Sequence, residues 1–590
     1  MSIDIETYRL KAQEAIEYVF VKEYHNSLGI PMPIVKMLLP DDANYSTGQY
    51  YITIDKTWQI HLNFGKLPIS YHEFQNEVKV LTRHEIEHYM CCPFDVITHF
   101  RMLKRIRDVY YKHFSHLGIN IEYACGAISN QAADIIVDTK NYYRHSKETL
   151  KSEIDWIKIG ANISACPRHC KLMFLTKEAI WKEDLGINET DPEFLKIVHQ
   201  LADSFTKNGI EDKSSFLDKV EEYAEIFFKL YVEDQKNPQQ SSQQGSQQQS
   251  GQQGSQQQSG QQGSQQQSGQ QGSQQQSGQQ GSQQQNGQWG VGRPKDGDEH
   301  GNAFVFADPD KVKEAIEVLA EETSVEEFID LLAIAGIIGM SDKQKGVLWF
   351  NVQSANIIPI VEFSNTGNKS SYTYPSVWRI GDPIEELDLM LTYMTSPRLI
   401  PGMTTKKWEY VSNDDNGTES KQMDLLLVVD TSGSMGSVMK ESANMHQAVL
   451  ASYGILSYFE STKSKVAFIG FSDKIDAYVD WSDKYDDVRE RLLTNGHGGT
   501  KFPISRIKST LDVRSRDLVT VLITDGDLGN INESVSYFRD YLNDDNKLYI
   551  FLLGGSKSLH SYEPLKNIGA KIYNANNANE FCDMVLTDME

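Results

Sequence analysis

The chain has 590 residues, more than a single hydrophobic core organises, so we expect several domains. A hydrophobic content of 39% supports ordinary folded cores. The formal net charge of −24 argues against nucleic acid or an anionic membrane as a partner, because both require a cationic surface. Neutral or basic proteins are the better expectation.

The residues from Met1 to Glu6 contain neither a basic segment nor an apolar core, so we expect no secretory signal. The longest apolar run, Leu331 to Met340, is too short to span a bilayer. Six cysteines spread along the chain form no disulfide framework, and the spacing of Cys166 and Cys170 is not that of a standard zinc knuckle. These features predict a cytoplasmic protein without a membrane span.

Residues 1–234 predict a mostly α (α+β) domain with one β-hairpin. Apolar residues recur at helical spacing from residue 4 to about 26, and two alternating runs, Gln49–Asp55 and Trp58–Phe64, predict the hairpin. Helical patterns follow over Tyr71–Met90, about Ala124–Tyr143, and from Asp191 to about Asp234.

The predicted helix Tyr71–Met90 contains an HExxH motif, His84-Glu85-Ile86-Glu87-His88. His84 and His88 lie one turn apart on one face, so both imidazoles can bind a single Zn²⁺. Glu85 is then placed to take a proton from a metal-bound water. We expect Glu87 to be a solvated helix residue. The motif is short, but here it follows a strand pair, which is the order found in zincin metallopeptidases.

A third zinc ligand is expected in the helix over about 124–143. Asp134 and Asp138 share one face of this otherwise apolar helix, and either carboxylate would complete the site. A helix cap or a surface ion pair is the competing interpretation.

On these motifs the N-terminal part resembles the metallopeptidase-like domain that accompanies a von Willebrand-like domain in a family of bacterial, archaeal and phage proteins. In that family an Ala-Ala-Asp helix follows the HExxH helix, and Ala132-Ala133-Asp134 matches it. The resemblance therefore implies Asp134 as the third zinc ligand. It also implies a protein or peptide substrate, with Glu85 as general base.

Residues 235–300 predict a disordered linker. From Gln243 to about Gln288 a nine-residue unit rich in Gln, Gly and Ser repeats without an apolar residue. Such a segment cannot bury enough surface to offset the entropy of ordering. About 50 flexible residues span on the order of 40 Å, which keeps the modules at either end near each other.

Residues 301–422 predict a small helical segment and a connecting arm. The segment has helices over Asp308–Ala320, Ser324–Gly339 and Ser341 to about Ala355, the second beginning with a capping box at Ser324 and Glu327. We expect it to pack beside the C-terminal domain or to dock a partner. The arm contains a short predicted helix, Ile384–Tyr393.

Residues 423–590 predict a Rossmann-like α/β domain whose mainly parallel sheet is covered on both faces, because buried strands alternate with helices. The predicted strands are Met423–Val429, Lys465–Phe471, Ala477–Trp481, Leu518–Ile523 and Leu548–Leu553. The predicted helices are Ser442–Phe459, Tyr485–Thr494, Phe502–Leu511, Asn532–Leu542 and Ala578–Met589.

Oxygen-bearing side chains follow two strands of this domain. Asp430, Ser432 and Ser434 come directly after the first strand, Asp525 follows a later one, and Thr500 lies in a loop between them. The carboxyl ends of parallel strands form the binding edge of an open α/β sheet. Hydroxyls and carboxylates there suit a hard cation such as Mg²⁺. An ordinary Rossmann-like domain with Ser and Gly in its turns is the alternative.

These three pieces resemble the metal-ion-dependent adhesion site of von Willebrand factor A domains. The resemblance implies that Ser432, Ser434 and Thr500 contact Mg²⁺ directly, and that Asp430 and Asp525 act mainly through water. A carboxylate from a protein partner would fill the open position. Proteins with this two-part organisation are similar to those encoded beside MoxR-type AAA+ ATPases, which implies such an ATPase as the partner.

Two functions of different classes fit the sequence. The first is a zinc-dependent peptidase whose magnesium-dependent module recruits or senses a protein partner. The alternative is a non-enzymatic adaptor that couples partners to the ATPase and whose N-terminal metal is structural. Structural zinc has a closed shell of four ligands, whereas catalytic zinc keeps a water, so three evident protein ligands favour the enzyme.

Overall fold

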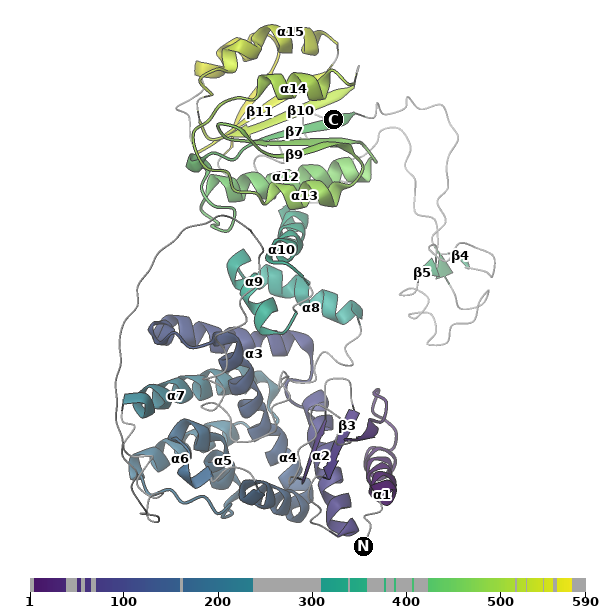
Figure 1. Ribbon diagram of the computed structural model, residues 1–590, viewed down its shortest axis with the longest axis vertical. Coiled ribbons are helices and arrows are strands. Elements are labelled where there is room, and N and C mark those ends of the chain that lie inside the picture. Colours follow the sequence, from purple (N-terminus) through teal and green to yellow (C-terminus); the bar gives the residue numbers. More distant parts are fainter. Residues whose placement is uncertain are drawn as a thin grey trace, which may run out of the picture. The chain divides into compact units, whose positions relative to one another are not determined.

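The computed structural model divides into two compact units, Met1–Met340 and Ser341–Glu590 (Figure 1). Among the residues that the structure describes, no helix has both the length and the apolar character needed to cross a membrane. The described residues are 5–38, 50–54, 59–64, 70–159, 163–236, 309–337, 340–357, 376–377, 387–388, 406–407, 423–514, 517–526, 528–544, 546–554 and 560–575.

The first unit is mostly helical, as expected. Its helices are α1 (Ile5–Glu17), α2 (Tyr71–Met90), α3 (Val96–Val109), α4 (Ile121–Ile159), α5 (Arg168–Trp181), α6 (Pro192–Thr206), α7 (Phe216–Lys236), α8 (Pro309–Glu322) and α9 (Val325–Ile334). A three-stranded sheet of order β1-β3-β2 combines β1 (Ile34–Met37), β2 (Tyr50–Ile54) and β3 (Gln59–Phe64). Strands β2 and β3 pair antiparallel, which confirms the predicted hairpin, and β1 pairs parallel with β3.

Helix α2 is fixed at its start by a capping box and along one face by apolar packing. Ser70 Oγ accepts a hydrogen bond from the Glu73 N–H, and the Glu73 carboxylate accepts one from the Ser70 N–H. Phe74, Val78 and Ile86 are fully buried in a cluster shared with α1 and the sheet. Each such side chain contributes about 1.5–3 kcal/mol of burial free energy. A different face of α2 packs on α4.

The helices expected beside the C-terminal domain are divided between the two units. Helices α8 and α9 pack on α3 in the first unit, where Arg107 lies 3.2 Å from Glu327 and 2.8 Å from Asp330. The acidic start of α9 therefore meets a basic face of α3, a complementarity that helical periodicity does not reveal. Only α10 (Asp342–Ile357) belongs to the second unit, where the ring of Phe350 lies 5.5 Å from that of Tyr453 in α12 (Asn444–Ser461).

Three predicted segments fall largely or wholly outside the described residues. They are the linker beyond residue 236, the arm, and the terminal helix Ala578–Met589. Within the arm, Leu387–Asp388 forms a short strand, β5, where the sequence predicts a helix. It pairs with β6 (Lys406–Lys407), which also pairs with β4 (Ser376–Val377).

The second unit is built on a six-stranded mixed sheet of order β12-β11-β10-β7-β8-β9. Neighbouring strands are parallel except β8 and β9, which are antiparallel. The five predicted strands are confirmed, while β12 was not predicted. The strands are β7 (Asp424–Asp430), β8 (Val466–Phe471), β9 (Ile475–Ser482), β10 (Leu518–Thr524), β11 (Lys547–Leu553) and β12 (Lys571–Ala575).

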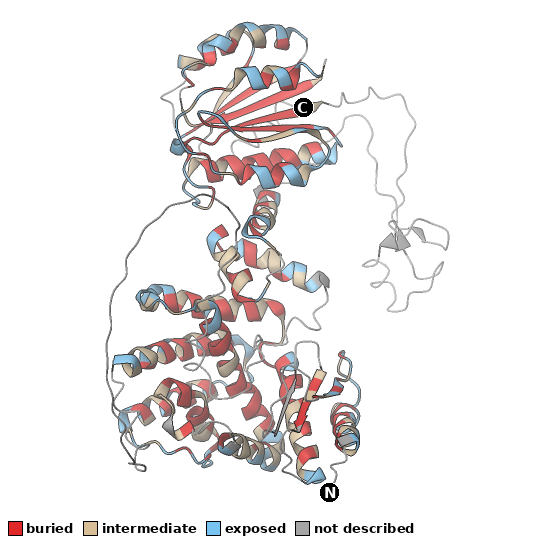
Figure 2. Cartoon of the chain, in the orientation of Figure 1, coloured by how far each residue is buried: buried red, intermediate tan, exposed pale blue. Residues whose placement is uncertain are grey.

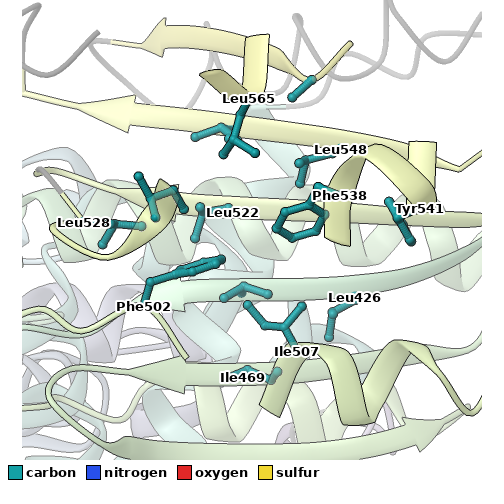
Figure 3. Close-up of a cluster of buried hydrophobic side chains, with 14 of the residues drawn as sticks. Leu426, Ile469, Phe502, Ile507, Leu522, Leu528, Phe538, Tyr541, Leu548 and Leu565 are labelled. Atoms are coloured by element: carbon teal, nitrogen blue, oxygen red, sulfur yellow. The ribbon is translucent and has the colours of Figure 1, made fainter. Parts of the chain in front are cut away.

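Helices cover both faces of this sheet. Figure 1 shows α12 and α13 (Tyr485–Leu492) on one face, with α14 (Ile504–Leu511) and α15 (Val535–Asn543) on the other. Figure 2 shows the central strands buried throughout, as expected of strands with helices on both sides. In Figure 3, Phe538 of α15 and Ile507 of α14 approach Leu522 and Leu426 of the sheet.

The order of the strands creates a position at the edge of the sheet where a ligand can bind. After β7 the chain continues to β8 on one side, and it returns later to β10 on the other side. The carboxyl ends of β7 and β10 therefore meet at a point where the connections diverge, which is where open α/β sheets bind ligands. Asp430 ends β7, and Asp525 directly follows β10.

Candidate metal centres

Three predicted zinc ligands lie together in the first unit. Asp134 Oδ1 lies 3.4 Å from His84 Nε2 and 3.2 Å from His88 Nε2, and the two Nε2 atoms are 3.1 Å apart. All three side chains are buried. A tetrahedral zinc ion with bonds near 2.0–2.1 Å separates its ligand atoms by about 3.3–3.4 Å. The three atoms are thus spaced as the edges of such a tetrahedron.

The hydrogen bonds of the two imidazoles direct lone pairs into this triangle. His88 Nδ1 lies 2.9 Å from the Cys92 carbonyl oxygen, which can only accept, so Nδ1 carries the hydrogen. His84 Nδ1 donates in the same way to Asp138 Oδ1 at 2.7 Å. In the neutral rings both Nε2 atoms are therefore acceptors, and Asp134 Oδ1 is a buried oxygen without a well-aligned donor. Three converging acceptors call for a cation.

The geometry separates the roles of the two aspartates that the sequence left open. Asp134 offers its Oδ1 to the centre, while Asn130 donates to its Oδ2 at 3.1 Å. Asp138 has one oxygen on His84 Nδ1 and the other on the Lys177 ammonium at 2.6 Å. Asp138 is therefore placed to orient the His84 ring, and a carboxylate in this position fixes a ring and raises its basicity.

The electrostatics of the cluster also favour a bound cation. Burial by itself lowers the pKa of His84, but the Asp138 carboxylate and its hydrogen bond outweigh burial and raise the pKa to about 9. Burial favours the neutral acid of Asp138, yet Lys177 and His84 hold its pKa well below its usual range. A field that favours a proton on His84 also favours a metal ion, which would displace that proton.

Glu85 and Glu87 differ in their surroundings, although both are buried. Glu85 adds to the negative potential at His84. Glu87 was expected to be solvated, and that expectation is wrong: Lys140 Nζ lies 2.7 Å from its Oε2, and Tyr24 donates to its Oε1 at 2.9 Å. Glu87 faces α4, which supplies Lys140 and Arg144 as the cationic partners of its carboxylate.

No cysteine takes part in a candidate metal site among the described residues, in line with the non-standard spacing of Cys166 and Cys170. There, one group of at least three His, Cys, Asp or Glu side chains brings ligand atoms within 4.8 Å of one another, and it consists of His84, His88 and Asp134. Cys92 takes part through its backbone carbonyl only, as the acceptor for His88.

In the second unit, most of the predicted magnesium ligands meet at the carboxyl ends of β7 and β10. Ser432 Oγ and Ser434 Oγ are 3.1 Å apart, and Ser434 Oγ donates to Asp525 Oδ1 at 2.9 Å. Octahedral Mg²⁺ with bonds of 2.0–2.1 Å separates adjacent oxygens by about 2.8–3.0 Å. These oxygens are close to that spacing before any ion is placed.

Asp430 and Thr500 are less directly connected to the oxygens of Ser432, Ser434 and Asp525. Asp430 is buried and uses both oxygens on protein donors, the Ser432 N–H at 2.9 Å and the Thr524 hydroxyl at 2.6 Å. Burial raises its pKa, and the donors only partly oppose this. Thr500 lies two residues after Gly498, whose carbonyl accepts from the Gly433 N–H at 3.3 Å. The loop of Thr500 thus touches the Ser432–Ser434 loop, while the hydrogen bonds seen among the described residues join the other four site residues and not Thr500.

Two residues at these sites were not predicted. Asn444, at the start of α12, donates to Asp525 Oδ2 at 3.1 Å and so fixes the oxygen that Ser434 does not use. Lys177 lies in α5, buried beside Asp138. The sequence held one indication of its burial, because Lys177 follows the apolar residues Leu172, Phe174 and Leu175.

Comparison with known proteins adds no assignment. No model of a known protein family matches the chain, and no curated protein matches it. Among solved structures, the chain is similar to the conserved hypothetical protein BatB from Bacteroides thetaiotaomicron, at 13% sequence identity and a TM-score of 0.24. That match covers 28% of this chain and 98% of BatB, and at this score it carries no argument.

The two aspartates should respond differently to substitution. Asp134→Ala removes a proposed ligand and should abolish stoichiometric zinc binding, whereas Asp138→Asn should keep the metal with an affinity about 10–100-fold weaker. Elemental analysis and competition with a chelator measure both effects. Asp155→Asn, a carboxylate of the same helix that pairs with Lys151, is the matched control. Loss of zinc from the Asp138 variant alone would reverse the assignment.

The buried position of Glu87 gives a prediction about stability. Glu87→Ala leaves Lys140, whose side chain is 8% exposed, with the exposed Glu211 carboxylate at 3.3 Å as its remaining partner and should lower the unfolding free energy of the first unit by about 1–3 kcal/mol. Glu6→Ala, which removes an exposed pair with Arg9, should change it little. Chemical denaturation followed by circular dichroism compares the two variants. Equally small changes would contradict the buried network.

Proposed function

We propose that the first unit is a zinc-dependent hydrolase of the peptidase class, and that the second unit is a magnesium-dependent protein-binding module. The observation that carries the first part is the convergence of His84 Nε2, His88 Nε2 and Asp134 Oδ1 at tetrahedral spacing. Three protein ligands leave the fourth position of a zinc ion for water or substrate.

The residues of the first unit have separate roles in this proposal. His84, His88 and Asp134 hold the ion, which when bound supplies Lewis acidity and an acidified water. Glu85 follows His84 on the same helix and is buried next to it, where its carboxylate would accept the proton of the attacking water. Asp138 and the Cys92 carbonyl hold the two imidazoles with Nε2 directed at the ion.

The proposal for the second unit rests on the oxygens gathered at the carboxyl ends of β7 and β10. Ser432, Ser434 and Asp525 offer hydroxyl and carboxylate oxygens, and Ser434 is exposed, so a group from outside can reach the site. An ion held by few anionic ligands favours a carboxylate from a partner. The partner that we propose from the resemblance is a MoxR-type AAA+ ATPase.

Glu85→Gln should abolish hydrolysis while zinc stays bound. The amide keeps the shape of the side chain but cannot accept the proton, so the rate should fall by about 10²–10⁴-fold. The assay is cleavage of a library of unstructured peptides, with zinc content measured on the same samples. Glu77→Gln, on the same helix, should cleave like the wild type. A fully active Glu85 variant would rule out the general-base role, and a zinc-loaded wild type without any hydrolysis would favour the adaptor.

Asp430→Ala should weaken divalent-ion binding to the second unit by at least about tenfold and leave the zinc of the first unit in place, because Asp430 holds the loop of Ser432. Electron paramagnetic resonance of bound Mn²⁺ measures this. Ser434→Ala, at an exposed position, tests the same site with less risk to folding. Ser437→Ala, in the same loop, is the control. Unchanged Mn²⁺ binding in both site variants would contradict the proposed magnesium site.

A further inference from the structure

Lys177 is a buried lysine that zinc coordination and proton transfer do not require. Its side chain is 2% exposed, and its ammonium donates to Asp138 Oδ2 at 2.6 Å and to Glu153 Oε1 at 2.9 Å. Asp138 in turn accepts from His84 Nδ1 at 2.7 Å. An unbroken chain of hydrogen bonds therefore runs from Glu153 through Lys177 and Asp138 to a proposed zinc ligand.

Stability alone does not account for this lysine. Removing an ammonium from water costs several kcal/mol, and replacing a buried ion pair by apolar residues of similar volume is often neutral or stabilising. Leu172 and Leu175, on the same helix, are buried, so an apolar side chain would suit the surroundings. The Lys177 ammonium instead binds Asp138 Oδ2, the carboxylate oxygen that His84 does not use.

The geometry shows what the lysine does to Asp138. One carboxylate oxygen receives the imidazole N–H and the other receives the ammonium, so the plane of the carboxylate is held at both oxygens. The orientation of the carboxylate sets the orientation of the His84 ring, and the ring directs Nε2 at the metal. The second bond of Lys177, to Glu153, fixes the ammonium itself.

We propose that Lys177 is a positioning residue of the zinc centre, which acts through Asp138 to hold His84 Nε2 in the direction that the metal requires. The inference rests on the proposed metal centre and not on peptide hydrolysis. This role distinguishes Lys177 from lysines whose ion pairs only stabilise the packing of helices.

The test uses the full-length protein and compares two buried lysines of the same helix. Lys177→Met should weaken zinc binding about 10–100-fold, as loss of an outer-shell partner does, and should shift the visible absorption bands of the Co²⁺-substituted protein. Lys171, 10% exposed at its side chain and 2.8 Å from Glu189, is the matched control. Lys171→Met should leave zinc affinity and the cobalt spectrum unchanged, whatever it does to thermal stability. If the two variants have the same zinc affinity, the proposal is overturned.

A double-mutant cycle tests the route through Asp138. On the background of Asp138→Asn, Lys177→Met should weaken zinc binding by less than about threefold, because the link that it acts through is already broken. A full additional loss would overturn the proposal. Should the methionine variant not fold, Lys177→Gln, which keeps an amide donor, carries the same comparison. A folded wild type that binds no zinc overturns both this inference and the proposed metal centre, whereas zinc binding without a Lys177 effect overturns this inference alone.

Discussion

The polar face that α2 turns toward α4 constrains the architecture of the first unit. Arg83, His84, Glu85, Glu87 and His88 are all buried, and burying such groups without partners costs several kcal/mol each. Arg83 is matched by Glu23 at 2.6 Å and by Glu148, while Glu87 is matched by Lys140. At His84, His88 and Asp134 the acceptors face one another instead. A cation at this point would complete the set of partners.

This constraint explains why the surrounding elements carry charge in places where apolar residues would pack. Helix α4 presents Asp134, Asp138 and Lys140 to α2, and α5 contributes Lys177. Asp138 pairs with the Lys177 ammonium, whereas Asp134 Oδ1 faces the two histidines, so a cation at that point would balance the charge of Asp134. The apolar side of α2, with Phe74 and Val78, supplies the burial free energy that holds this polar side in place.

Sequence patterns predicted the helices and strands well because buried apolar residues recur at regular spacing within each element. The repeat of apolar residues located α2, and the apolar runs located five of the six strands of the large sheet. The choice between Asp134 and Asp138 was not available from periodicity, since residues four apart share a helix face. It is decided by Lys177, which lies 39 residues beyond Asp138 in the chain.

Other differences between the sequence-based expectations and the structure also arise from contacts between elements that are distant in the chain. Glutamate is usually a surface residue, and the burial of Glu87 is compensated by the approach of Lys140, Arg144 and Tyr24. Helices α8 and α9 were expected to pack beside the C-terminal domain or to dock a partner. The pairing of Arg107 with Glu327 and Asp330 instead places them in the first unit, beyond a segment that the structure does not describe.

The donor atoms of the two proposed sites favour different ions. Two imidazole nitrogens and one carboxylate oxygen favour a borderline-soft ion such as Zn²⁺ and offer too few oxygens for Mg²⁺. Ser432, Ser434 and Asp525 offer oxygen only, which suits a hard ion that keeps several waters. Zinc would bind there weakly, because hydroxyl oxygens are poor ligands for it compared with imidazole. Each proposed site would therefore take the ion that its own donor atoms favour.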